Sequence, residues 1–189
     1  MKKFLKILGI AIGIKILIIV GILYYHGFFT EPVVTEKEVG PYTIAVKRFI
    51  GGYYQVGPTM TEVDSWIRGQ GVSSTKGIGL FYDDPGTVEE SKLRSDVGNV
   101  LEGVDEQTIE TIKMQLEVKE LPVMRAVVID FPIVSPLSYM IAPMKVYPAI
   151  SKYWKEKGYP EEGGVGYSIE LYDMPGKITT YVMPIPGEQ

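Results

Sequence analysis

The chain has 189 residues, 46% of them hydrophobic, and no cysteine, which excludes disulfides, thiolate nucleophiles and zinc–thiolate sites. Its one histidine, His26, precedes the main domain, so catalytic triads, histidine metal sites and an axial haem histidine are excluded there. Apart from four lysines among the first thirty residues, 15 basic residues face 23 acidic ones, a net charge of −8. We therefore expect no cofactor, no metal and no nucleic-acid partner, and a cationic or neutral ligand rather than an anionic one.

Residues 1–30 are predicted to anchor the chain in a membrane. Ile10–Phe29 is apolar over twenty residues, about the length that a helix needs to span the hydrocarbon. The alternative is a cleaved signal peptide, since Lys2, Lys3 and Lys6 form a basic leader, but no small-x-small cleavage site follows. Basic residues precede the single span and acidic residues follow it. The positive-inside rule then places the N-terminus in the cytoplasm and the domain outside.

The next part of the chain has the pattern of strand, helix, strand, strand. A Pro near the first helical position and a capping box at Thr59-Met60-Thr61-Glu62 favour the helix start. The predicted elements are a strand over 33–49 bent at Gly40-Pro41, a helix from Pro58 or Thr59 to about Arg68, and strands over 77–82 and 93–101. A short linker helix over about 105–114 follows.

The second part repeats this order. A strand over 115–121 leads into a strong strand over 124–131, after which Pro132 and Pro136 are predicted to break the chain. A helix is predicted over 148–157, stopped by Gly158 and Pro160. The last two predicted strands, 167–172 and 178–183, meet at a Pro-Gly turn.

A short internal match supports a repeat. Leu80–Gly86 and Glu170–Gly176 share Tyr, Asp, Pro and Gly at a constant offset, which aligns Leu80 with Glu170. We predict an α+β domain over 31–189, built as a tandem βαββ repeat about a pseudo-twofold axis. Its antiparallel sheet would carry two main helices, with halves at about 33–103 and 115–186.

The strand around Glu170 is the main candidate for a site. Alternation places Ser168, Glu170 and Tyr172 on one face and apolar neighbours on the other. A carboxyl between apolar neighbours loses hydration, so we expect its pKa to lie above the ordinary value of about 4.3. The alternative is that Glu170 is an ordinary exposed acid.

The order of elements, the Trp near each predicted helix end and the Ile-Glu-Leu-Tyr strand before a Pro-Gly turn resemble the GyrI-like small-molecule-binding domain of the SOUL/GyrI-like superfamily. The stretches 76–85 and 92–98 look most like its membrane-anchored branch, whose type member is a receptor of endoplasmic-reticulum autophagy. The resemblance covers roughly 33–186. It implies a ligand groove where the two halves meet.

The resemblance also assigns roles, with some departures. In drug-sensing members the acid matching Glu170 faces cationic ligands, and in hydrolase-like members it acts as a base, which makes Glu170 and Tyr172 the catalytic candidates. The sequence has no matching DNA-binding segment and stops three residues after Pro186. We therefore expect neither transcription regulation nor the branch's autophagy role, and haem binding would lack a histidine.

The domain is rich in aromatic residues, which suit flat or cationic ligands through stacking and cation–π contact. For Trp66 and Trp154 the alternative is that they pack the helices onto the sheet. The surplus aromatics are Tyr53, Tyr54, Trp66, Tyr82, Tyr139, Tyr147, Trp154 and Tyr172. The predicted ligand-binding residues are Glu170, Tyr172, Tyr53, Tyr82, Trp66 and Trp154.

Three other motifs are interpreted as structural. Residues 92–96 are expected to form a salt-bridged strand edge rather than an anion site. The acids of 83–90 lack the spacing of a calcium loop and are expected to be solvated. The glycines of 163–166 precede no helix and are not a phosphate loop.

The sequence leaves three functions open. The favoured one is a membrane-anchored domain that binds a hydrophobic or cationic small molecule in the groove between its halves. The first alternative is a hydrolase of strained electrophiles that uses the groove Glu. The second is a protein-interaction scaffold without a ligand.

Overall fold

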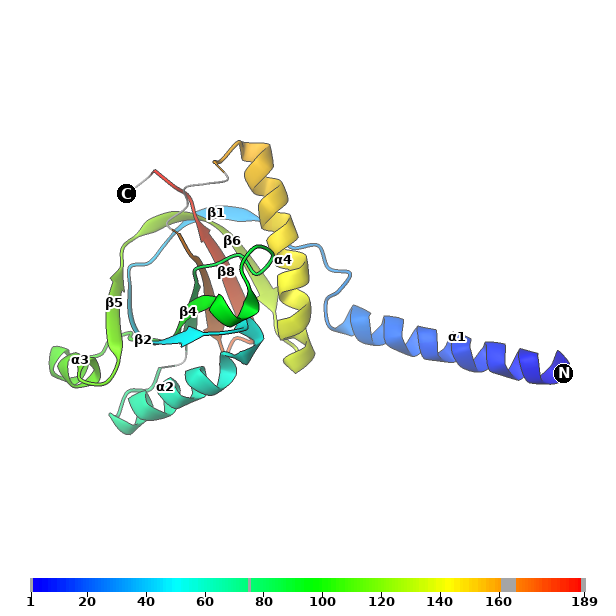
Figure 1. Cartoon of the computed structure of the whole chain (residues 1–189), viewed down its shortest axis with the longest axis horizontal. Helices are drawn as coiled ribbons and strands as arrows, with labels where there is room; N and C mark the ends of the chain where they lie inside the picture. The colour runs from blue at the N-terminus through cyan, green and yellow to red at the C-terminus, as the bar shows by residue number, and fades with distance from the viewer. Residues whose placement is uncertain (1, 75, 161–165, 188–189) are drawn as a thin grey trace.

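The computed structural model describes residues 2–74, 76–160 and 166–187. An apolar N-terminal helix leads into an α+β body whose strands form one curled antiparallel sheet (Figure 1). The helices are α1 (Lys2–Tyr25), α2 (Gly57–Gly69), α3 (Glu106–Lys113) and α4 (Pro136–Lys157), with 3-10 turns at Tyr53–Gln55 and Glu90–Lys92. The strands are β1 (Thr35–Val39), β2 (Tyr42–Ile50), β3 (Lys76–Phe81), β4 (Arg94–Val100), β5 (Glu117–Leu121), β6 (Met124–Pro132), β7 (Ser168–Asp173) and β8 (Ile178–Pro184).

The strand order is symmetric about its centre. It runs β1-β6-β8-β7-β3-β4-β2-β5, so β7 and β3 are the central pair and each outer strand has a counterpart on the other side. One unit is β2-α2-β3-β4 and the other is β6-α4-β7-β8. The predicted α+β class and tandem βαββ arrangement are confirmed.

The structure corrects the sequence match that aligned Leu80 with Glu170 as equivalent residues of the two units. Glu170 lies opposite Gly79, while Leu80 lies opposite Ile169. Leu80 and Ile169 both point into the buried core, whereas Glu170 lies on the other face. Equivalent residues of the two units must lie on the same face of the sheet, so Leu80 is not the counterpart of Glu170.

The inside of the curl is a core made by strands alone. It contains apolar residues from both units, such as Ile44, Ile78, Val128 and Ile169. The sheet bends far enough that a Cβ on Gly40, in the turn between β1 and β2, would lie 2.8 Å from the Pro122 carbonyl oxygen. Pro122 connects β5 to β6. This close approach draws the two outer edges of the sheet together (Figure 1).

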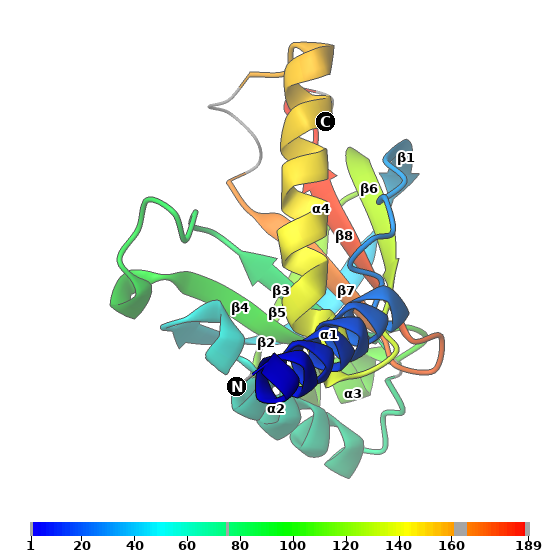
Figure 2. The same cartoon turned by 90° about the vertical axis from the view of Figure 1, so that its right-hand side faces the viewer.

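The helices cover the outer face of the sheet. Val63 and Ile67 of α2 pack with Ile112 of α3 over the first unit. Ile141 and Val146 of α4 pack over β6 and β8 of the second unit. Because each helix covers its own unit, the central strands β3 and β7 lie between α2 and α4 (Figure 2).

Two predictions about the helices were wrong. α4 begins at Pro136 and not at Pro148, and Pro143 and Pro148 lie inside it. The Ser135 side chain caps this helix, and the burial of its apolar face compensates for the hydrogen bonds that the prolines remove. The capping box predicted at the start of α2 is also absent, because Val56 is the N-cap and no side-chain cap bond forms.

The helix α1 is long and apolar enough to cross a membrane, a test that a signal sequence also passes. None of its most apolar window is buried against the rest of the protein, so it is not a core helix. It projects away from the body beside the start of α4 (Figure 1).

Candidate functional site

A pocket of about 1840 Å³ lies on the outer face of the sheet, between α2 and α4 and above β3 and β7. Two glycines of β3 keep its floor open. A Cβ on Gly77 would lie 3.1 Å from the Met60 methyl group, and one on Gly79 would lie 2.7 Å from the Phe81 ring. The two glycines therefore leave the space that the Met60 methyl group and the Phe81 ring occupy in the pocket wall.

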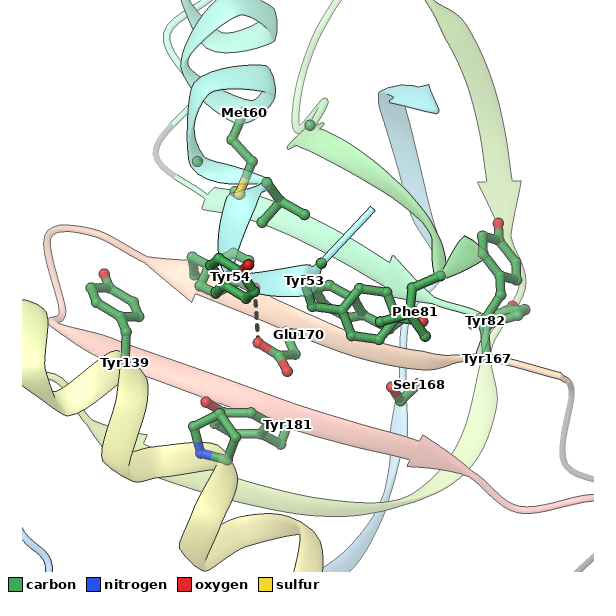
Figure 3. A pocket seen from close by; sticks show the side chains of 18 of the residues that line it. Tyr53, Tyr54, Met60, Phe81, Tyr82, Tyr139, Tyr167, Ser168, Glu170 and Tyr181 are labelled. Carbon is green, nitrogen blue, oxygen red and sulfur yellow. Dashed lines mark hydrogen bonds between the residues drawn. The ribbon is translucent and has the colours of Figure 1, made fainter. Parts of the chain in front are cut away.

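Glu170 lies in the centre of the pocket wall (Figure 3). It is 9% exposed, and its two carboxylate oxygens accept hydrogen bonds from two tyrosines. The Tyr147 hydroxyl of α4 donates to Oε1 at 2.7 Å, and the Tyr172 hydroxyl donates to Oε2 at 2.8 Å. Within the described part of the chain Glu170 makes no ion pair, so its only direct partners are neutral donors.

This environment changes the protonation of the site. Burial raises the pKa of Glu170 above its ordinary value, although the hydrogen bonds from Tyr147 and Tyr172 act in the opposite direction. The predicted upward shift is therefore confirmed. Burial, together with the negative charge of Glu170, raises the pKa of both tyrosines well above the usual value. The two hydroxyls therefore stay protonated and keep donating to the carboxylate.

Aromatic rings surround the carboxylate on several sides. Tyr147 contacts Tyr181 of β8 edge-on at 5.8 Å, and Tyr139 of α4 lies 6.3 Å from Tyr172. On the α2 side the ring of Tyr53 packs edge-on against Phe81 at 4.8 Å, and Met60 points into the same space (Figure 3). The arrangement joins one buried negative charge to faces and edges of aromatic rings, which is the chemistry that holds organic cations.

The structure brings four of the six predicted ligand-binding residues to this pocket: Glu170, Tyr172, Tyr53 and Tyr82. The hydroxyl of Tyr82 nevertheless points to the other side of the sheet, where it donates to Asp96 at 2.6 Å.

Trp66 and Trp154 do not line the pocket. Trp66 packs against the cluster that joins α2 to α3. Trp154 packs on Tyr159 at 5.0 Å and donates to the Pro160 carbonyl oxygen. Both therefore hold helices in place, which is the alternative that the sequence left open for them.

Several pocket residues were not among the predicted site residues. Tyr139 and Tyr147 follow each other with Pro143 along one face of α4, a spacing hidden when the helix was predicted to begin at Pro148. Tyr181 faces the pocket from β8, and the alternation of this strand could have indicated it. Phe81 and Met60 complete the wall and carry no distinctive motif.

Residues 92–96 do not form an edge of the sheet, because β4 pairs with β3 on one side and with β2 on the other. The expected ion pairs are present, with Lys92 bound to Glu89, Arg94 bound to Asp83, and Asp96 bound to two cations. Asp83 was expected to be solvated, but its side chain is only 10% exposed. Within the described ranges no group of acids could hold a metal ion. The glycine run at 163–166 lies largely outside the described residues.

The comparisons with known proteins assign the family. Residues 32–183 match the GyrI-like small molecule binding domain. The chain belongs to the GyrI-like family. The human testis-expressed protein 264 is 30% identical over 164 residues, which make up 81% of this chain and 51% of the human protein. The chain thus spans about half the length of this curated relative.

Solved GyrI-like structures share the fold. The C-terminal domain of EcmrR has a TM-score of 0.54 at 15% identity and covers 83% of this chain and 99% of that domain. The structure of SAV2435 bound to tetraphenylphosphonium has a TM-score of 0.53 at 13% identity, over 82% of this chain and 94% of the other. At such identities the likeness shows the fold alone.

Proposed function

We propose that this GyrI-like domain is tethered to a membrane by α1 and binds a hydrophobic organic cation in the pocket between α2 and α4. The observation that carries the proposal is Glu170, a buried carboxylate with two neutral hydrogen-bond donors and no ion pair within the described residues. A buried charge without a counter-ion is costly, and a cation held against the aromatic walls would supply one. The lipophilic cation bound to SAV2435, a protein with the same fold, supports this ligand class.

The first experiment measures binding of tetraphenylphosphonium to the full chain in detergent by isothermal titration calorimetry. Replacement of a charged partner at a desolvated contact costs about 1.5–3 kcal/mol, so Glu170→Gln is expected to weaken binding roughly 10- to 100-fold. Glu62→Gln is the matched control, because Glu62 is an exposed acid of α2 whose loss changes the net charge equally. Equal affinities of the two variants would remove Glu170 from the ligand site.

The pH dependence gives an independent readout. Because the pKa of Glu170 is raised, the carboxyl takes up its proton at a higher pH than an exposed acid does. The affinity for the cation is therefore expected to fall as the pH is lowered through this pKa. Triphenylphosphine oxide, a neutral aromatic analogue, should bind more weakly and without this dependence.

A second function is favoured by the hydrogen bonds of the site. A carboxylate whose pKa is raised by burial can act as a general base, and the protonated hydroxyls of Tyr147 and Tyr172 lie beside it as candidate general acids. We propose hydrolysis of a strained electrophile, such as an epoxide, as this alternative. Turnover of aromatic epoxides that is lost in Glu170→Gln would support it. Cation binding without turnover would favour the binding function over hydrolysis.

A further inference from the structure

The mouth of the pocket carries an exposed apolar rim. Met140 is 70% exposed and Tyr139 is 39% exposed on the first turns of α4, and Met174 is 64% exposed in the turn between β7 and β8. All three line the pocket, and the Tyr139 hydroxyl lies 3.8 Å from the Met174 sulfur. Met144, 66% exposed, extends the rim one turn further along α4. Contiguous exposed apolar side chains mark an interaction surface.

This rim adjoins the end of α1. Leu23 and Phe28 pack into the apolar cluster beneath α4, and the His26 Nδ1 atom lies 3.1 Å from the Ser135 hydroxyl at the α4 N-cap. Lys145 of α4 lies over the Phe28 ring at 5.8 Å. The body therefore contacts the last turn of α1 through Leu23 and holds the segment directly after the helix through His26 and Phe28.

These contacts determine which face of the body is turned toward the side from which α1 leaves. Figure 1 shows α4 crossing the direction of α1 at the side from which α1 leaves, with α3 at the opposite side. Seen from that side, α4 and α2 face the viewer together with α1 and flank β3 and β7 (Figure 2). Ile141, Ala142 and Val146 of α4 are buried against the sheet, so Met140 and Met144 lie on the opposite face of the helix.

The aromatic residues at the end of α1 set the level of the membrane boundary. Tyr24, Tyr25 and Phe29 are 74%, 68% and 53% exposed, and such side chains gather where hydrocarbon meets water. Met140 lies five residues along α4 from Ser135, which corresponds to about 8 Å of helix. Because α4 crosses the direction of α1, its outer face lies along this boundary and does not rise away from it.

We propose that the rim formed by Tyr139, Met140, Met144 and Met174 rests in the headgroup region of the bilayer that α1 spans. The pocket then opens onto lipid, and its ligand enters laterally from the membrane. The ligand class is an amphiphile already dissolved in the bilayer, with its cationic group directed to Glu170 and its apolar part near the rim. This inference rests on the proposed membrane tether and binding function, and adds the route and the source of the ligand.

The test uses single cysteines in the full chain, reconstituted in phosphatidylcholine vesicles. The sequence has no cysteine, so one nitroxide label can be placed without background. Met140→Cys and Met144→Cys report the rim, and Val20→Cys reports insertion of α1. Met114→Cys is the matched control, because Met114 is 74% exposed at the end of α3, on the side away from α1 (Figure 1).

Relaxation by oxygen and by a water-soluble nickel chelate measures the depth of each label. We expect the labels at 140 and 144 to be at least about 3-fold less accessible to the nickel chelate than the label at 114, and the label at 20 to be the deepest. If the label at 20 is deep but those at 140 and 114 are equally accessible, the mouth faces water and the inference is overturned. If the label at 20 also faces water, the tether fails, and the inference fails with it.

A measurement of cation binding distinguishes a failure of lateral entry from a failure of the proposed binding function. The unlabelled chain in the same vesicles is titrated with tetraphenylphosphonium, because Met140 lines the pocket and a label there would itself change binding. Glu170→Gln is added as the binding-deficient variant. A rim in lipid with Glu170-dependent binding supports both proposals. A rim in water with unchanged binding removes only the lateral entry. A rim in lipid without any binding shows a membrane-docked face but no cation site, and so overturns the proposed ligand route.

Discussion

Glu170 and Asp96 are both buried carboxylates of the same sheet, but their partners differ. Asp96 is 0% exposed and binds Arg48, Lys119 and the hydroxyl of Tyr82. Although burial acts to raise it, the hydrogen bonds from these three residues hold the pKa of Asp96 below its usual range. Glu170 has hydroxyl donors alone, and burial determines the direction of its shift. The negative charge of Asp96 is therefore balanced by two cationic side chains and serves the structure. The charge of Glu170 has no cationic partner within the described residues.

This difference predicts how Glu170 affects stability. A carboxyl whose pKa is higher in the folded than in the unfolded chain binds its proton more tightly when folded. Its contribution to stability is present in full below the unfolded pKa of about 4.3 and is lost as the pH rises through the folded pKa. We therefore expect Glu170→Gln to increase the free energy of unfolding at pH 7, by about 1.4 kcal/mol for each tenfold by which folding tightens proton binding, and to have little effect below pH 4.

Urea unfolding of the full chain in detergent, at a series of pH values, measures this difference between variant and parent. Glu62→Gln is the control for the loss of one exposed acid, which forms a surface ion pair with Lys47. A Glu170→Gln variant that is less stable than the parent at pH 7 would contradict the prediction. It would mean that the hydrogen bonds from Tyr147 and Tyr172 outweigh the cost of burying the charge.

At the scale of elements, local patterns predicted the strands better than the helices. Alternation over 167–172 assigned the faces of β7 correctly, because one side of that strand meets the strand-only core and the other meets the pocket. The length of α4 could not be predicted from its prolines. Pro143 and Pro148 are tolerated because Ile141 and Val146 pack beneath them, a contact between segments that no local rule contains.

The pocket was only partly predictable for a similar reason. Glu170 and Tyr172 follow from one strand and its resemblance to a known family. Tyr147 and Tyr181 come from α4 and β8, and they meet Glu170 only because the sheet places β8 beside β7 and the helix above both. Trp66 and Trp154 were predicted as ligand-binding residues because of their residue type, but each packs near the end of its own helix.

A substitution at Ser135, the N-cap of α4, tests what stabilises the start of this helix. Its hydroxyl accepts from the Leu137 N–H at 3.1 Å and contacts His26 at the junction with α1. Loss of an N-cap of this kind costs about 1 kcal/mol, so we expect Ser135→Ala to lower the free energy of unfolding by about that amount. Ser151→Ala, at an exposed position within α4, should be neutral or slightly stabilising. Urea unfolding of both variants gives the comparison, and equal stabilities would exclude the capping role.

At the scale of the whole molecule, the two units exchange their outer strands. β1 lies before the first unit in the chain but pairs with β6 of the second, and β5 lies before the second unit but pairs with β2 of the first. Glu36 of β1 accepts hydrogen bonds from Arg125, Tyr153 and Tyr159, all from the second unit. Together with the central β3–β7 pair, these contacts make the core inside the curl common to both units, although each unit also has its own cluster beneath its helices.

We therefore expect the body to unfold in one cooperative step. Each unit contains one tryptophan, so Trp154→Phe leaves Trp66 as the reporter of the first unit and Trp66→Phe leaves Trp154 as the reporter of the second. Within each variant, tryptophan fluorescence and far-ultraviolet circular dichroism should give the same urea midpoint, because coincident probes are the mark of a two-state transition. Comparison within one variant removes the effect of the substitution on stability. If either tryptophan reported unfolding at a lower urea concentration than the backbone signal, that unit would be opening first. The exchanged strands and the shared core would then not couple the two halves.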